Sequence, residues 1–316
     1  MTGPLVVTGG TGLLGSAVRR LCPGAVCLSR ADGDLRDFSV ARRLIDELRP
    51  SRVLHLAGCV GGVKANAAQN SRFFEENALI NASVLSAARM HRVPRLIAVL
   101  SSCAFPVYAD RATSEADVQA HLPYDGNAGY AQAKRMLDTH IRLVAKEDGL
   151  AWTTITPVTM YGPHDSFEPE SGHVVGALIR RCHEAMTRGS AYTVWGSGQA
   201  VRQFVFVEDV ARVLLAALNQ PMEPGTTIVA PDEGVSIRVL AESVARACGY
   251  QGPIRYDRSQ PEGVLVKRLR SERFSASFPG FQFTPLQVGL DDTVRWFRDH
   301  GTGSTVKTQA GCCATR

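Results

Sequence analysis

Two residues capable of acid–base chemistry, Tyr130 and Lys134, stand four positions apart in the middle of this sequence. The run from 135 to 147 reads as a helix, so this spacing puts the phenol and the ammonium on one helix face. A nearby ammonium favours the phenolate and lowers a phenol pKa of about 10 toward neutrality, which suits an acid that protonates a developing alkoxide. The competing interpretation is an exposed polar pair, because two residues alone are a weak motif.

Three further side chains have suitable chemistry. Ser101 and Cys103 follow an apolar run from 96 to 100 that predicts a buried strand. The carboxyl ends of such strands face the ligand in α/β sheets, and alternation along an extended chain places Ser101 and Cys103 on the same side. His173 precedes a helical run, and a thiol and an imidazole both exchange protons near neutral pH. Taken alone, Cys103 also reads as a small buried hydrophobe and His173 as an ordinary polar residue.

A glycine-rich turn follows the first apolar segment. Gly9, Gly12 and Gly15 stand between a predicted strand over 5–8 and a helical run from 16 to 21. Glycines in this position permit a tight turn, close approach of backbone N–H groups to a pyrophosphate, and close packing of the helix on the sheet. The competing interpretation is a tight turn without a ligand.

Arg30 ends the second predicted strand, where an NAD-binding protein usually has a carboxylate for the ribose 2′-hydroxyl. A guanidinium at that point favours the 2′-phosphate of NADP. Asp34 and Leu35 follow at positions that would bracket an adenine ring. The alternative for Arg30 is a solvated loop residue.

Strand-like and helix-like segments alternate about six times before residue 162, which predicts an α/β fold with a Rossmann-type, doubly wound parallel sheet. We expect residues 1–165 to form an NADP-binding domain that the C-terminal part of the chain re-enters. Residues 166–300 are expected to form a smaller α/β substrate lobe. The segment 301–316, rich in Gly, Thr and Ala, is expected to be a disordered tail.

The composition, 45% hydrophobic and 21% charged, is typical of a soluble globular protein. The net charge is +5 and basic residues are interspersed with acidic ones, so we predict an anionic small molecule rather than nucleic acid as the partner. The sequence has neither a membrane-length apolar run nor a leader-like start, which predicts a cytoplasmic protein without a membrane partner. Its eight cysteines include no Cys-x-x-Cys pair and no zinc-type spacing, so we predict no metal.

The order of these motifs resembles that of the extended short-chain dehydrogenase/reductases, and more closely that of the GDP-L-fucose synthases. The resemblance runs from about residue 5 to residue 298. Its most specific segments are Val60–Gly62, Ser101–Pro106, Tyr161–Phe167, Gly172–Val174, and Val194–Gly198 together with Arg202–Phe204.

The resemblance implies a homodimeric, NADPH-dependent epimerase-reductase that converts GDP-4-keto-6-deoxy-D-mannose to GDP-L-fucose. It implies that Cys103 is the base and His173 the acid that invert C3 and C5. It also implies that Tyr130 protonates the C4 oxygen while Ser101 hydrogen-bonds to it. Lys134 would hold the nicotinamide ribose and lower the tyrosine pKa.

The expected ligand contacts fall into two sets. The cofactor candidates are Gly9, Gly10, Thr11, Gly12, Leu13, Leu14, Gly15, Arg30, Asp34, Leu35, Leu56, Ala57, Gly58, Tyr130, Lys134, Pro157 and His173. The substrate candidates are Ser102, Arg181, Trp195, Arg202 and Lys267. We expect the two arginines, and the lysine as a weaker candidate, to bind the diphosphate, and Trp195 to stack near the guanine or the sugar. Each basic residue alone also reads as a solvated charge.

Two departures from the family pattern lie near the expected sugar pocket. Thr159 stands where an asparagine is common, and Gly176 where a proline is usual. They leave open an enzyme of the same fold that acts on another nucleotide 4-keto-6-deoxy sugar, for example in GDP-colitose formation. A non-catalytic NADP-binding regulator is a further alternative, although such a protein usually lacks the tyrosine or the lysine.

Overall fold

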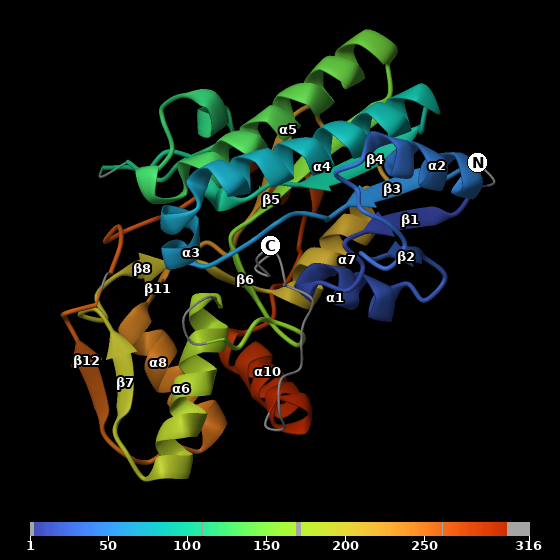
Figure 1. Ribbon diagram of the computed structural model, residues 1–316. Coiled ribbons are helices and arrows are strands. Elements are labelled where there is room, and N and C mark those ends of the chain that lie inside the picture. The colour runs from blue at the N-terminus through green and yellow to red at the C-terminus, as the bar shows by residue number, and fades with distance from the viewer. Residues whose placement is uncertain (1–2, 109, 169–171, 261, 302–316) are drawn as a thin grey trace.

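The computed structural model describes residues 3–108, 110–168, 172–260 and 262–301. Its larger lobe is built on a six-stranded parallel sheet in the order β10-β5-β4-β3-β1-β2 (Figure 1). The strands are β1 (Leu5–Thr8), β2 (Val26–Leu28), β3 (Arg52–His55), β4 (Arg95–Val99), β5 (Ala151–Pro157) and β10 (Thr226–Val229). The predicted doubly wound parallel sheet is confirmed. The predicted tail lies outside the described residues beyond Gly301.

Helices cover both faces of this sheet (Figure 1). One face has α2 (Phe38–Leu48), α4 (Asn70–Met90) and α5 (Ala128–Asp148), and the other has α1 (Leu13–Leu21) and α7 (Val207–Ala217). Two short helices, α3 (Val63–Ala68) and α9 (Glu272–Ser277), lie near α4 and against β10 respectively. Because the central strands are covered on both sides, their residues form continuous apolar runs, with Val53, Leu54, Leu96 and Ile155 almost fully buried.

The sixth strand differs from the expectation of six β-α units before residue 162. The segment β6 (Thr159–Tyr161) leaves the large sheet and pairs with β9 (Phe204–Phe206). The edge beside β5 is filled instead by β10, which pairs in parallel with Thr154–Pro157. A four-residue strand that returns after about seventy intervening residues has no local periodicity that would reveal it.

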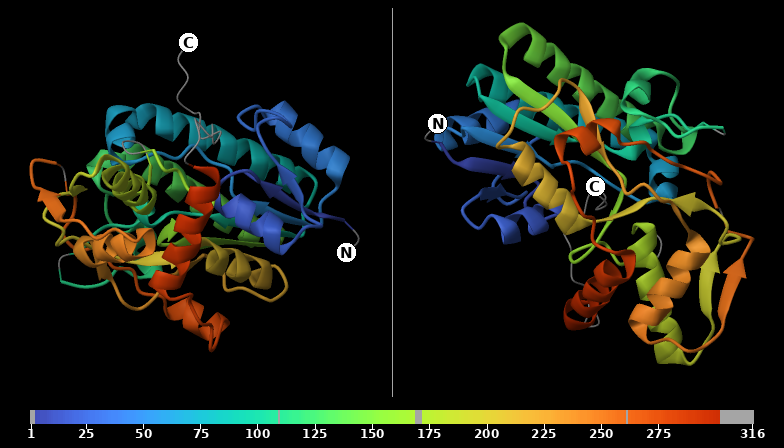
Figure 2. Two further views of the ribbon diagram at one scale, coloured as in Figure 1. Left: turned by 90° about the horizontal axis from the view of Figure 1, so that it is seen from below. Right: turned by 180° about the vertical axis from the view of Figure 1, so that it is seen from behind.

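A smaller lobe has its own apolar core. It contains α6 (Val174–Arg188), β7 (Tyr192–Trp195), α8 (Ile237–Cys248), β12 (Ile254–Asp257) and α10 (Leu286–His300). Strand β7 pairs in parallel with β12, while β8 (Val201–Arg202) pairs with β11 (Val235–Ser236) in the antiparallel sense. Figure 2 shows these elements, mostly yellow to red, beside the blue-to-green larger lobe.

Three 3-10 helices complete the described secondary structure: η1 (Ser102–Ala104), η2 (Glu115–Gln119) and η3 (Asp125–Asn127). Within the described ranges, no helix has both the length and the apolar character needed to cross a membrane. The same part of the chain contains no group of three or more His, Cys, Asp or Glu side chains that could hold a metal ion.

Candidate active site

The start of α5, which presents Tyr130, is fixed against the start of α4. A Cβ added at Gly129 would lie 2.0 Å from the Asn70 carbonyl oxygen, so only glycine permits this approach of the two backbones. The Asn70 side chain accepts a hydrogen bond from the Gly129 N–H at 2.9 Å and donates to the Asp125 carbonyl at 3.0 Å. The helix therefore begins at a defined point, two residues before the tyrosine.

Tyr130 and Lys134 lie together as their spacing predicts. The Lys134 ammonium is 5.7 Å from the centroid of the Tyr130 ring and donates to the Val99 carbonyl at 2.8 Å. Lys134 is buried, and burial lowers its pKa to about 8. Burial also raises the pKa of Tyr130, while a hydrogen bond with Ser101 opposes that rise. The predicted lowering of the tyrosine pKa by Lys134 is therefore not what this structure shows, because desolvation of the phenolate outweighs the other effects.

Ser101 and Cys103 reach the tyrosine by a different backbone path from the predicted one. Strand β4 ends at Val99, and Cys103 lies in the 3-10 helix η1, so alternation along an extended chain does not apply. Instead, the Ser101 hydroxyl caps this helix by accepting a hydrogen bond from the Cys103 N–H at 3.2 Å. Both side chains act on Tyr130: Cys103 raises its pKa and Ser101 lowers it. The three groups thus share one site at the carboxyl end of β4, and Ser102 lies in the same turn.

A buried polar chain, which the sequence analysis missed, connects the first strand to this helix. The Thr8 hydroxyl donates to His55 Nδ1 at 2.9 Å, and His55 Nε2 donates to Asn81 Oδ1 at 3.1 Å. The Asn81 amide then donates to the Ala133 carbonyl, between Tyr130 and Lys134. Burial lowers the pKa of His55 to about 4, so the ring is neutral. A histidine inside an apolar strand was the available signal.

The predicted cofactor segment after β3 joins the same region. The N–H groups of Leu56 and Ala57 both donate to the Thr8 hydroxyl at 3.2 Å. A Cβ added at Gly58 would lie 2.9 Å from the Asn77 side chain and 3.7 Å from the Lys134 ammonium. The carboxyl end of β3 therefore lies beside Lys134. Pro157 is the last residue of β5, at the same carboxyl end of the parallel strands.

The glycine turn has the shape that a dinucleotide requires. Gly9 has a φ of +73°, and a Cβ added at Gly15 would lie 2.2 Å from the Gly9 carbonyl oxygen. Helix α1 begins after Gly12, with Leu13 and Leu14 in its first turn and no side-chain cap. Such an N-terminus presents backbone N–H groups that suit a pyrophosphate, so these residues fit NADP. Gly10 and Thr11 complete the turn, and Thr11 is exposed.

The adenosine end has a cluster of arginines around one buried carboxylate. Glu76 of α4 is 2.7 Å from Arg72, 3.8 Å from Arg36 and 4.0 Å from Arg30. Asp34, predicted to bracket adenine, is engaged by Arg36 through charge-assisted hydrogen bonds, which lower the Asp34 pKa. Arg36 was not predicted from the sequence, although it stands only two residues after Asp34. The structure thus places a second guanidinium beside Arg30, and Leu35 lies between Asp34 and Arg36.

His173 is the N-cap residue of α6 and pairs with a buried carboxylate. Its Nδ1 lies 3.2 Å from Asp165 Oδ1, and that oxygen also accepts the Ser166 N–H at 2.8 Å. The hydrogen bond to Asp165 raises the pKa of His173, so the imidazolium persists above its ordinary pH range. Asp165 belongs to the Tyr161–Phe167 motif, and no role was predicted for it from the sequence. Because Nδ1 is committed to Asp165, Nε2 is the atom that can transfer a proton.

Four of the five predicted substrate residues lie in two pairs. The Arg181 guanidinium lies 3.8 Å from the Trp195 ring centroid, where a guanine was expected to stack. Arg202 and Lys267 are partly buried, and burial lowers the pKa of both. Cys103 raises the pKa of Lys267 and Arg202 lowers it, so both groups lie within electrostatic range of this lysine. The structure therefore connects one substrate pair to the predicted base.

The departure at Gly176 has a local cause. A Cβ at this position would lie 2.2 Å from the Ser166 carbonyl oxygen, so no larger residue fits without moving the 166–167 backbone. Thr159 lies in β6, where it pairs with Phe204.

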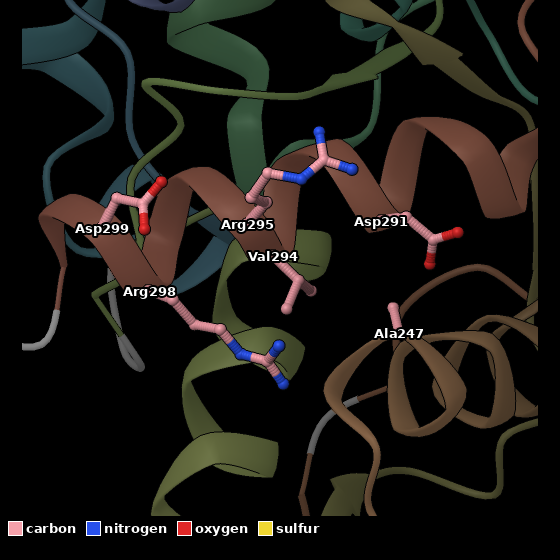
Figure 3. Close-up of a pocket in the computed structure, with 6 residues that line it drawn as sticks. All are labelled: Ala247, Asp291, Val294, Arg295, Arg298 and Asp299. Atoms are coloured by element: carbon pink, nitrogen blue, oxygen red, sulfur yellow. The ribbon is translucent and has the colours of Figure 1, made fainter.

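A separate depression lies between α8 and α10 (Figure 3). It is lined by Ala247, Asp291, Val294, Arg295, Arg298 and Asp299. None of these is a predicted site residue, so this depression is separate from the candidate active site.

Comparisons with known proteins show the family to which this chain belongs. Residues 5–230 match the NAD dependent epimerase/dehydratase family. GDP-L-fucose synthase of Dictyostelium discoideum is 30% identical over 305 residues, which cover 94% of this chain and 95% of the relative. The enzyme of Escherichia coli K12 with the same name is 29% identical, with 93% and 96% covered.

A solved structure supports the same family assignment. The crystal structure of a GDP-L-fucose synthetase from Naegleria fowleri bound to NADP superposes with a TM-score of 0.88. It is 32% identical and covers 94% of this chain and 93% of its own. The resemblance predicted from the motifs is thereby confirmed. The chain belongs to the NAD dependent epimerase/dehydratase family, and within it to the GDP-L-fucose synthases.

Proposed function

We propose that this chain converts GDP-4-keto-6-deoxy-D-mannose to GDP-L-fucose by inverting C3 and C5 and reducing the C4 ketone with NADPH. The observation that supports this most is the meeting of Tyr130, Ser101 and Cys103 at the carboxyl end of β4, with Lys134 against the tyrosine ring. Relatives of this name match the chain along nine-tenths of its length. An enzyme acting on a different nucleotide sugar is not favoured.

The cofactor is NADP. The turn from Gly9 to Gly15 would hold its pyrophosphate, and Arg30 with Arg36 would bind the 2′-phosphate through charged hydrogen bonds. Lys134 would hold the nicotinamide ribose. When bound, NADPH supplies the hydride that reduces C4.

Epimerisation is assigned to Cys103 and His173. The C4 ketone acidifies the protons on C3 and C5, and each inversion needs a base on one face of the carbon and an acid on the other. Cys103 as thiolate takes the proton and becomes a thiol, while His173 as imidazolium donates one and becomes neutral. Exchange with solvent then restores both groups for the second carbon. Asp165 supports the acid role because it raises the pKa of His173.

Reduction is assigned to Tyr130, which donates its proton to the C4 oxygen as charge grows there. Burial keeps this phenol protonated at neutral pH, as a proton donor requires. Ser101, already hydrogen-bonded to the phenol, would stabilise the same oxygen. The residues that would bind the GDP diphosphate are Arg181, Arg202 and Lys267.

The decisive experiment incubates the purified protein with GDP-4-keto-6-deoxy-mannose and NADPH in deuterated water. GDP-fucose with deuterium at C3 and C5, identified by NMR, is the expected product. NADPH oxidation to a sugar that is not epimerised would remove Cys103 and His173 from their roles. Absence of reaction would overturn the proposed substrate.

We also propose a homodimer formed through α4 and α5. Leu79 on α4 and Met136 and Leu143 on α5 are each about half exposed, and an interface over these two helices would bury them. Light scattering of the purified protein should give twice the mass of one chain. The variant Leu143→Glu should give the mass of a single chain. The predicted cytoplasmic location stays a prediction.

A further inference from the structure

Lys64, which lies in α3 of the larger lobe, contacts an aromatic residue of the smaller lobe. Its ammonium is 4.2 Å from the centroid of the Trp195 ring, at the end of β7. Figure 1 shows α3 at the border between the lobes, next to β8 and β11. Lys64 lies two residues after the Val60–Gly62 motif, and neither composition nor spacing pointed to it.

The same ring carries a second cation, because the Arg181 guanidinium lies 3.8 Å from its centroid. Two positive charges over one indole repel each other, and an exposed cation–π contact is individually weak. Lys64 forms no ion pair with a carboxylate among the residues that the structure describes, and its side chain is exposed. An anionic ligand beside Trp195 would therefore be a stronger partner for the exposed Lys64 ammonium than the indole face.

Further charged side chains lie between Trp195 and the predicted base. Ser197, two residues beyond Trp195, hydrogen-bonds to Glu262, and the charge of Glu262 acts on Arg202. Arg202 in turn lowers the pKa of Lys267, whose other neighbour is Cys103. Basic side chains thus continue from the indole toward the reacting end of the site, and Lys64 is the one among them that comes from the larger lobe.

We propose that Lys64 is a substrate-positioning residue that leaves the Trp195 ring and binds the diphosphate of the sugar nucleotide. This inference rests on the proposed function, because it takes the ligand to be a guanosine diphosphate. A phosphate oxygen is a stronger partner for an ammonium than an indole face, so the diphosphate displaces the ring contact. The vacated indole face becomes available to the ligand, and the two lobes are held together through it.

The test measures GDP, GMP and guanosine binding by calorimetry for the intact protein and for Lys64→Met, which keeps the aliphatic length and removes the charge. We expect GDP to bind about tenfold more weakly to Lys64→Met, while guanosine affinity is unchanged. Lys64→Arg should restore GDP binding to within about threefold. In turnover, Lys64→Met should raise the KM for the sugar nucleotide and leave kcat at saturation unchanged. Lys146→Met, an exposed site on α5, is the matched control.

The possible outcomes distinguish failure of this inference from failure of the proposed function. Equal GDP affinity in the intact protein and Lys64→Met would overturn the inference while leaving the proposed function standing. An equal loss for guanosine and GDP would also overturn it, because Lys64 would then act on the base through Trp195. Failure of the intact protein to bind GDP would overturn the proposed function and the inference together.

Discussion

Lys134 and Arg135, adjacent in α5, donate to carbonyl groups on either side of the Ser101–Cys103 segment. The Lys134 ammonium donates to Val99 at 2.8 Å, and Arg135 Nε donates to Ala104 at 2.7 Å. Both side chains are buried, and burial lowers the pKa of each. One turn of one helix therefore fixes both the tyrosine and the segment that presents the serine and the cysteine.

The first prediction concerns Arg135→Leu. Loss of the hydrogen bond to Ala104 loosens η1, which serves reduction through Ser101 and epimerisation through Cys103. We expect both rates to fall by about tenfold, with the Kd for NADPH unchanged. The free energy of unfolding should change little, because removal of a buried charge offsets the lost hydrogen bond. Deuterium exchange and NADPH oxidation measured in parallel give the two rates, and a fall in only one of them would contradict this role.

Tyr130→Phe removes the proton donor and little else. We expect reduction to slow by about 10²–10⁴-fold, the usual contribution of a general acid. NADPH binding, followed by fluorescence, and deuterium incorporation at C3 and C5 should persist. Unchanged turnover would mean that another group protonates the C4 oxygen.

Cys103→Ser separates the two half-reactions. A hydroxyl is a much weaker base precursor than a thiol, so deuterium incorporation at C3 and C5 should fall far more than hydride transfer to an already epimerised substrate. NMR of the exchanged sugar and NADPH absorbance measure the two effects. Equal losses would reject the assigned role of the cysteine, and Cys22→Ser, at the C-terminal end of α1, serves as the control.

The variant Asp165→Asn tests the acid role of His173 through the pH dependence of epimerisation. The carboxylate raises the pKa of His173, and a proton-donating imidazolium is lost as pH rises through that value. The amide should therefore move the alkaline limb of the epimerisation profile to lower pH. The same raised pKa makes a contribution to stability that is full below about pH 6.5 and is lost as pH rises through the folded-state value. An alkaline limb that does not move would show that His173 is not the acid.

The arginines around Glu76 predict cofactor choice. Arg30→Ala and Arg36→Ala should each weaken NADPH about tenfold and leave NADH nearly unaffected, since only NADPH has the extra phosphate. Titration of each variant with both nucleotides measures this. Arg43→Ala, in an exposed ion pair on α2, is the matched control. A parallel loss for both nucleotides would mean that the arginine does not contact the 2′-phosphate.

The parts of the site that depend on short sequence spacing were the predictable ones. The glycine turn and the pairing of Tyr130 with Lys134 follow from local backbone geometry. What the sequence did not reveal depends on contacts between distant segments: Glu76 beside Arg30, Lys64 on Trp195, and the chain from Thr8 to Asn81. The raised pKa of Tyr130 was missed for a related reason, because burial is a property of the whole fold.

The late arrival of β10 also bears on how the chain is synthesised. Strand β5 ends at Pro157, but its outer neighbour is not made until residues 226–229 leave the ribosome. During the intervening interval the nascent chain has an unpaired, apolar strand edge, which is a template for pairing with other chains. The large sheet is therefore complete only after residue 229 has been made, and a gene fragment ending near residue 165 encodes a sheet that lacks β10.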